Sequence, residues 1–169
     1  MTVHTLVLGI GNPLMADDGA GTRVIELLRL EALPAGVELR DGGTAGVALV
    51  SELENVERLI LVDCAKMAPH PGENGQIAPI PGTWRRLELE ETRLLDGEAT
   101  PLSLHDANLR DALRLAEALD LLPEEVIIYG IQPASVEWDR PMSAQVSAAL
   151  PAVVQAVLQE IGKQAVGPQ

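Results

Sequence analysis

The fold of this chain is constrained most strongly by three short, nearly continuous apolar runs, at residues 5–10, 59–62 and 126–131. A strand that is apolar at almost every position has both faces buried, which is typical of a parallel sheet covered by helices on both sides. Amphipathic helical patterns alternate with these runs, and this alternation favours an α/β fold. We therefore expect a single α/β domain in three layers, with a mostly parallel twisted sheet and helices on both faces.

Local signals predict the remaining elements. They are a helix at 22–32, a strand at 37–40, a turn at 41–44, a helix capped by Thr44 and running to about Leu53, weak strands near 77 and 87–89, a helix opened by Ser103 and Asp106, and a last helix at 143–162. The helix opened by Ser103 should bury Leu109, Ala112, Leu113 and Ala116. Pro151 should kink or divide the last helix. Residues 1–162 would form the domain and 163–169 a flexible C-terminal tail.

Composition excludes several classes of function. The 169 residues are 47% hydrophobic, enough for one domain with a full core. A net charge of −13 and a shortage of aromatic residues disfavour nucleic-acid binding, because phosphates would be repelled and bases would find no stacking platform. No signal peptide or membrane span is predicted from the first residues. Since the single cysteine, Cys64, also fits a reducing compartment, we expect a cytoplasmic protein.

Polar side chains follow the predicted strands, at the edge where open α/β sheets bind ligands. Asp17 and Asp18 follow the first strand, Asp41 the second and Asp63 the third, while His105 begins a helix. An aspartate in a first helical turn most often caps that helix, so neither Asp17 nor Asp18 alone indicates a function. A carboxylate that directly follows four apolar residues is expected to be partly buried and to need a partner or a cation.

Asp18, Asp63 and His105 together could bind a divalent ion, since two carboxylates and an imidazole suit a transition metal. Their sequence spacing carries no metal signature, so their proximity depends on the predicted topology alone.

A nucleotide site is one alternative for the same region. Gly9 and Gly11 follow a strand, as in loops that bind phosphates through backbone N–H groups. Leu14 stands where the third glycine of the dinucleotide motif is required, and the paired aspartates would repel a phosphate. Both features disfavour nucleotide binding.

The order and spacing of these motifs resemble those of the hydrogenase maturation proteases, nickel-dependent endopeptidases that act on the large subunit of [NiFe] hydrogenases. The matching segments are residues 9–12, 17–21 and 41–46, Asp63, His105 after 102–104, and 129–133. The similarity covers nearly the whole chain. The combination is specific, although no single motif is.

The resemblance implies a set of site residues. The metal-contacting and catalytic positions would be Asp18, Asp63 and His105. Some members have glutamate at the first position, so Asp18 has a shorter reach. Asp17 would cap its helix or support Asp18. The turn that approaches the substrate with its backbone would consist of Asp41, Gly42, Gly43 and Thr44.

By the same resemblance, the protein would remove the C-terminal extension of a [NiFe] hydrogenase large-subunit precursor after nickel insertion. The nickel would be supplied by the substrate, and the protease is expected to be a monomer. The metal could polarise the scissile carbonyl or supply hydroxide while a carboxylate, in aspartic-type fashion, accepts the proton. An alternative from a different class is a metal-sensing docking chaperone that binds the same precursor without cutting it.

Overall fold

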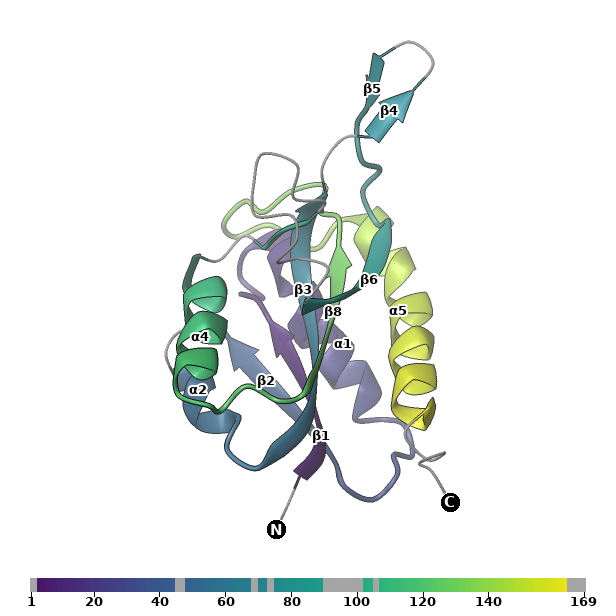
Figure 1. The fold of residues 1–169 in the computed structure, drawn as a ribbon. Helices are drawn as coiled ribbons and strands as arrows, with labels where there is room; N and C mark the ends of the chain where they lie inside the picture. The colour runs from purple at the N-terminus through teal and green to yellow at the C-terminus, as the bar shows by residue number, and fades with distance from the viewer. Residues whose placement is uncertain are drawn as a thin grey trace.

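A mixed sheet with the strand order β2-β1-β3-β8-β6 forms the middle layer of the molecule (Figure 1). The structure, a computed structural model, describes residues 3–44, 48–67, 70–72, 75–89, 102–104 and 107–163. The strands are β1 (Val3–Ile10), β2 (Val37–Gly43), β3 (Val56–Met67), β6 (Trp84–Glu88), β7 (Leu102–Leu104) and β8 (Glu125–Ile131), beside a hairpin of β4 (His70–Gly72) and β5 (Gly75–Ile77). The pairs β1–β2, β1–β3 and β3–β8 are parallel, whereas β6 and β7 pair antiparallel with β8 and β3. The predicted mostly parallel sheet is confirmed.

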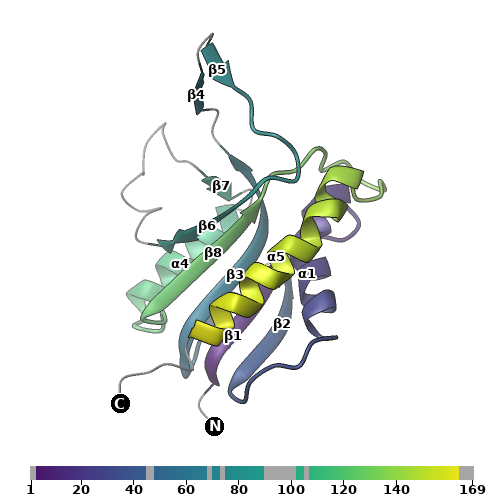
Figure 2. The ribbon, with the colours of Figure 1, turned by 90° about the vertical axis from the view of Figure 1, so that its right-hand side faces the viewer.

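Helices cover both faces of this sheet (Figure 2). The helical elements are the 3-10 helix η1 (Ala16–Gly19), α1 (Ala20–Leu28), α2 (Ala48–Glu52), α4 (Ala107–Ala118) and α5 (Ala144–Gly162). Because side chains alternate along β3, Leu59 and Leu61 pack in the core beneath α2 and α4, while Ile60 and Val62 pack in the core beneath α1 and α5. The expected single α/β domain with three layers is therefore confirmed.

Several elements match the sequence prediction closely. The apolar runs at 5–10 and 126–131 lie in β1 and β8. The predicted face of α4 is buried, at Leu109, Ala112, Leu113 and Ala116. Ser143 caps α5, and its hydroxyl accepts a hydrogen bond from the N–H of Val146 at 3.3 Å. Pro151 lies inside α5, and the helix continues through it undivided.

Strand β3 is longer than predicted. It was expected to end at Asp63 but continues to Met67, because β8 pairs with it as far as Cys64 and β7 then pairs with residues 65–67. The side-chain oxygen Oε1 of Gln132 also accepts the N–H of Met67 at 2.7 Å. Ser103, predicted to cap a helix, lies in β7 instead, and α4 begins at Ala107. Asp106, its predicted partner in the cap, lies outside the described residues.

Other predicted boundaries also shift. The helix expected at 22–32 is α1, which begins earlier and ends at Leu28, so that Leu30 is exposed. Strand β2 continues through Gly43, so residues 41–43 are strand rather than turn. Of the predicted tail, Lys163 caps α5 and pairs with Glu160, and residues 164–169 lie outside the described part of the chain. Within the described helices, none is long and apolar enough to cross a membrane.

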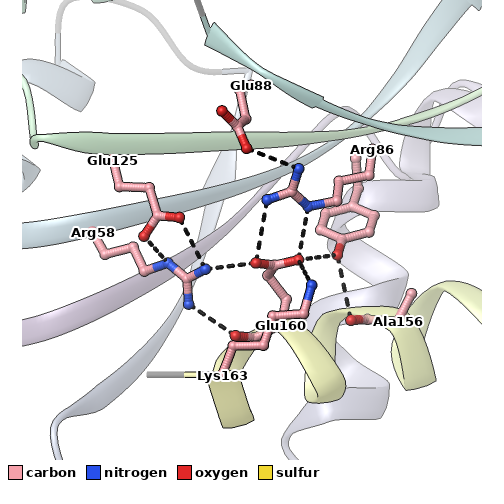
Figure 3. Close-up of polar contacts among 8 residues, drawn as sticks. Arg58, Arg86, Glu88, Glu125, Ala156, Glu160 and Lys163 are labelled. Atoms are coloured by element: carbon pink, nitrogen blue, oxygen red, sulfur yellow. Dashed lines mark hydrogen bonds and ion pairs between the residues drawn. The ribbon is translucent and has the colours of Figure 1, made fainter. Parts of the chain in front are cut away.

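Ion pairs connect the last turn of α5 to the sheet (Figure 3). This end of α5 is the one opposite the predicted site. We call this group the Glu160 cluster: Arg58, Arg86, Glu88, Glu125, Tyr129, Glu160 and Lys163. Arg58 is buried and donates to Glu160 Oε1 at 2.6 Å, and Arg86 Nε donates to Oε2 at 2.7 Å. Burial raises the pKa of Glu160, but hydrogen bonds from Arg86 and Lys163 outweigh it and lower that pKa to about 2. The cluster therefore holds a charged carboxylate that anchors α5.

Candidate active site

The carboxyl ends of β1, β3 and β8 meet at one edge of the sheet, and we call this edge the rim. Gly9 of β1 pairs with Val62, and Gly130 of β8 pairs with Asp63, so all three strands reach the same level. After β1 the chain turns back over the rim and forms η1, which contacts β3. The segment that carries Asp18 therefore lies against the strand that carries Asp63.

The glycines after β1 are required by close backbone contacts. A Cβ atom on Gly11 would lie 1.7 Å from the carbonyl oxygen of Asp18, and the φ of Gly11 is +136°. A Cβ atom on Gly21 would lie 2.3 Å from the carbonyl oxygens of both Ile10 and Val62. A side chain at either position would push η1 or α1 away from the rim. These contacts account for Gly11 without a nucleotide, which removes the main support for the nucleotide-binding alternative.

Asp18 is half-buried in η1, and hydrogen bonds among residues 12–18 fix its carboxylate. Its Oδ2 accepts the backbone N–H of Asn12 at 2.9 Å. The side chain of Asn12 in turn accepts the N–H of Leu14 at 3.0 Å, and the N–H of Asp18 donates to the carbonyl of Met15 at 3.0 Å. Asp18 is thus held close to the end of β1 by the N–H of Asn12 and by its own N–H.

Asp63 is 3% exposed and lies within β3. Alternation along the strand places it on the same face as Leu61 and Ala65, which α2 and α4 cover. Its burial agrees with the expectation drawn from the preceding apolar run. A buried carboxylate loses hydration that other groups must replace, so this position is costly unless polar groups or a cation face it.

The thiol of Cys64, next to Asp63 in β3, is affected by the acidic residues at the rim. Burial raises the pKa of Cys64 far above its usual value, and the charges of Asp63, Asp18 and Asp17 raise it further, in that order. All three carboxylates therefore lie within electrostatic reach of one side chain. The thiol stays protonated at neutral pH and is a buried core residue rather than a nucleophile.

The motif Asp41, Gly42, Gly43 and Thr44 forms the end of β2 and the first residue beyond it. Asp41 Oδ1 accepts the N–H of Gly43 at 2.9 Å and the hydroxyl of Thr22 at 3.2 Å. Gly43 has a φ of +53°, and its carbonyl accepts the N–H of Gly11 at 2.8 Å, which ties the motif to the rim. A cleft of about 180 Å³ lies beside the motif, lined by Leu8, Arg40, Asp41, Gly42, Thr44, Ala48, Leu49 and Glu52.

His105, the third predicted metal contact, lies outside the described residues. It follows Leu104, which pairs with Ala65 of β3, two residues beyond Asp63. In the part of the chain that the structure describes, no group of three or more His, Cys, Asp or Glu side chains could hold a metal ion. The described rim therefore supplies at most two of the three predicted ligands, Asp18 and Asp63.

Asp17 has partners that sequence reasoning missed. It was interpreted as a cap or a support for Asp18, and its carboxylate receives hydrogen bonds from Ala134, Ser135 and Ser143, more than a hundred positions away. The only signal in the sequence was a second acidic residue beside Asp18. Long-range partners of this kind cannot be found from local spacing.

Comparison with known proteins identifies the family. The family model described as hydrogenase maturation protease (HycI) matches residues 22–160. The chain belongs to the hydrogenase maturation protease family. The hydrogenase 2 maturation protease of Escherichia coli K12 is 33% identical over 168 residues, which cover 97% of this chain and 96% of that protein. The hydrogenase expression/formation protein HupM of Azotobacter chroococcum mcd 1 is 36% identical over 165 residues, covering 94% of this chain and 73% of that protein.

Solved structures agree with this assignment. The hydrogenase maturating endopeptidase HybD from Escherichia coli has a TM-score of 0.77 at 29% identity, covering 95% of this chain and 93% of that one. A hydrogenase 2 maturation peptidase from Thaumarchaeota archaeon SCGC_AB-539-E09 has a TM-score of 0.67 at 32% identity, covering 94% and 98%. The resemblance noted from the sequence motifs is therefore confirmed. As a member of this family, the protein is an endopeptidase.

Proposed function

We propose that this protease removes the C-terminal extension of a [NiFe] hydrogenase large-subunit precursor once nickel has been inserted. Asp18, Asp63 and His105 contact the nickel that the precursor carries, so the metal enters the site as part of the substrate. The observation that supports this best is the arrangement of the rim, where η1 brings Asp18 against the strand that contains the buried Asp63. The names of the relatives, which refer to hydrogenases, support this choice of partner.

The donor set suits a metal delivered by the substrate. Carboxylates and an imidazole are ligands for divalent transition metals, and three of them leave positions open for the precursor and for water. Nickel brought by the precursor would supply Lewis-acid chemistry, either at the scissile carbonyl or at a bound water whose pKa it would lower. A rim carboxylate would accept the proton from the attacking water and return it to the peptide nitrogen as the C–N bond breaks.

The end of β2 is the proposed contact for the precursor chain. Among the described strands, β2 is the last on its side of the sheet, so its outer edge offers backbone groups to an extended peptide. Gly43 adds no side chain that would hinder this approach, and the cleft beside it has room for a substrate side chain. The carboxylate of Asp41 accepts hydrogen bonds from Gly43 and Thr22, and in this way it fixes the end of β2.

The test is a pair of incubations of the protease with its precursor, one nickel-loaded and one metal-free, without added metal. We expect a mass loss equal to the C-terminal extension only in the loaded sample, and none with the variant His105→Ala. Equal cleavage of both precursors contradicts nickel recognition. Formation of a stable complex without any mass loss supports the docking-chaperone alternative instead.

A further inference from the structure

Asp17 is a fully buried carboxylate whose hydrogen-bond donors all come from the segment before α5. Its Oδ1 accepts the N–H of Ser143 at 2.6 Å. Its Oδ2 accepts the N–H of Ala134 at 2.8 Å, the N–H of Ser135 at 3.1 Å and the hydroxyl of Ser143 at 2.9 Å. Since Ser143 caps α5, the positive end of that helix also favours the negative charge. Four donors thus replace the water that Asp17 loses on burial.

The backbone around Asp17 is bound to the same segment. The N–H of Asp17 donates to the carbonyl of Ser135 at 3.1 Å. The N–H of Asp139 donates to the carbonyl of Leu14 at 2.9 Å, and Met15 forms a β-bridge with Arg140. The loop before η1 is therefore attached at several points to the connection between β8 and α5.

We propose that Asp17 is a positioning residue for the cleavage reaction: it fixes η1 so that the carboxylate of Asp18 is presented at the rim beside Asp63. Asp18 follows Asp17 within the same 3-10 turn, so any rotation of that turn moves both carboxylates. The hydrogen bond from the N–H of Asn12 to Asp18 Oδ2 depends on that placement. The catalytic part of this inference rests on the proposed function, whereas the geometric part can be measured without any substrate.

An amide cannot replace Asp17. Both of its oxygens accept, and an asparagine offers only one acceptor and turns an NH₂ group toward donors. With Oδ1 replaced, that NH₂ group would face the N–H of Ser143. The variant Asp17→Asn therefore keeps the volume of the side chain while breaking the attachment of η1.

The experiment combines two measurements on Asp17→Asn and on a matched control, Glu160→Gln, which makes the same chemical change to a buried carboxylate far from the rim. The first is amide hydrogen exchange, followed by NMR at Asn12 and at residues 59–62 in the core of β3. The second is the rate of cleavage of nickel-loaded precursor, with kcat and KM determined separately at a temperature where both variants are folded.

We expect exchange at Asn12 to accelerate in Asp17→Asn while exchange at 59–62 stays as in the unmodified protein. Its kcat should fall by about 10²-fold with little change in KM, as expected for misplacing a reacting group by about 1 Å. Glu160→Gln should leave both Asn12 exchange and kcat unchanged. If Asp17→Asn does not fold, Ser143→Ala, which removes one of the four donors, should show the same pattern to a smaller extent.

Three results overturn the proposal. The first is unchanged exchange at Asn12, and the second is accelerated exchange at Asn12 and 59–62 together, which would mean general destabilisation. The third is an unchanged kcat in a folded Asp17→Asn. If the unmodified protease does not cut the loaded precursor, the proposed function fails, and the exchange at Asn12 alone then decides whether Asp17 positions Asp18.

Discussion

Asp17 and Glu160 are both buried carboxylates, and they hold opposite ends of α5 by different means. Asp17 meets the start of the helix and is stabilised by backbone N–H groups and a hydroxyl. Glu160 lies in the last turn and is stabilised by Arg58, Arg86 and Lys163. Dipoles compensate a charge locally without cancelling it, whereas cations cancel it. The end of α5 at the rim is thus fixed in a way that preserves negative potential near Asp18, and the other end is neutralised.

This difference matters for a site that is proposed to receive a metal. An arginine beside Asp17 would repel a divalent ion and compete for Asp18. Backbone donors fix the loop without adding a positive charge. The two ends of α5 should therefore respond differently to substitution: changes at the rim should affect cleavage, and changes in the Glu160 cluster should affect stability.

The largest effect is expected from Asp63→Asn, which removes a charge from the rim. If Asp63 contacts the metal or accepts the proton, cleavage of nickel-loaded precursor should slow by about 10²–10⁴-fold. The free energy of unfolding must be measured alongside, because Asp63 is buried and an amide at this position changes its hydrogen bonds as well as its charge. Single-turnover cleavage and denaturant unfolding measure the two quantities. A folded variant with the original rate would remove Asp63 from the reaction.

The next effect is expected from Arg58→Met at the other end. Arg58 donates to the side chain of Glu160 and to its carbonyl, and it also pairs with Glu125. Removing one partner of a buried ion pair costs about 3–5 kcal/mol of stability, because the remaining charge stays buried. Urea unfolding should show this loss, while kcat measured on folded protein should not change. A drop in kcat would show that the two ends of α5 are coupled.

Acid should weaken the Glu160 cluster. Hydrogen bonds from Arg86 and Lys163 outweigh burial and lower the pKa of Glu160 from 4.5 to about 2, so the unfolded chain binds a proton more readily than the folded one. The stability contributed is therefore present above pH 4.5 and is lost as the pH falls towards 2. The difference corresponds to roughly 3 kcal/mol. Unfolding free energies measured from pH 6 to pH 3 should decline less steeply in Glu160→Gln, and equal slopes would contradict this assignment.

The layers of the fold could be predicted because a strand with both faces buried is apolar at every position. Residues 59–62 are apolar at every position since each contacts one of two cores. The continuation of β3 to Met67 left no such pattern. It depends on pairing with β7, some forty positions away, and includes the exposed Lys66. Pairing between distant segments cannot be read from local periodicity.

The candidate site was predictable in the same uneven way. Asp63 was found because a charge directly after an apolar run must be buried, and it is. Glu160 was missed, and the partners of Asp17 were not foreseen, because each resembles an ordinary polar helix residue. Their partners lie up to 126 and 102 positions away, so only the folded chain distinguishes them from surface residues.

The smallest effect is expected from Tyr129→Phe. The Tyr129 hydroxyl lies 3.2 Å from Glu160 Oε2 and 3.3 Å from the carbonyl of Ala156, and its single hydrogen can serve only one acceptor fully. Burial, followed by the charge of Glu160, raises the pKa of Tyr129 to about 12, so the hydroxyl is a donor at neutral pH. Phenylalanine keeps the ring that packs against Trp84, and Glu160 retains three cations. The loss should therefore be about 1 kcal/mol in unfolding free energy, the usual net value of one hydrogen bond.

A double-mutant cycle tests whether the hydroxyl belongs to the cluster. The stability lost in the double variant Tyr129→Phe with Arg58→Met should exceed the sum of the losses in the two single variants, because each substitution leaves Glu160 more dependent on the other donor. Strict additivity would show that the hydroxyl bonds to Ala156 and plays no part in the cluster.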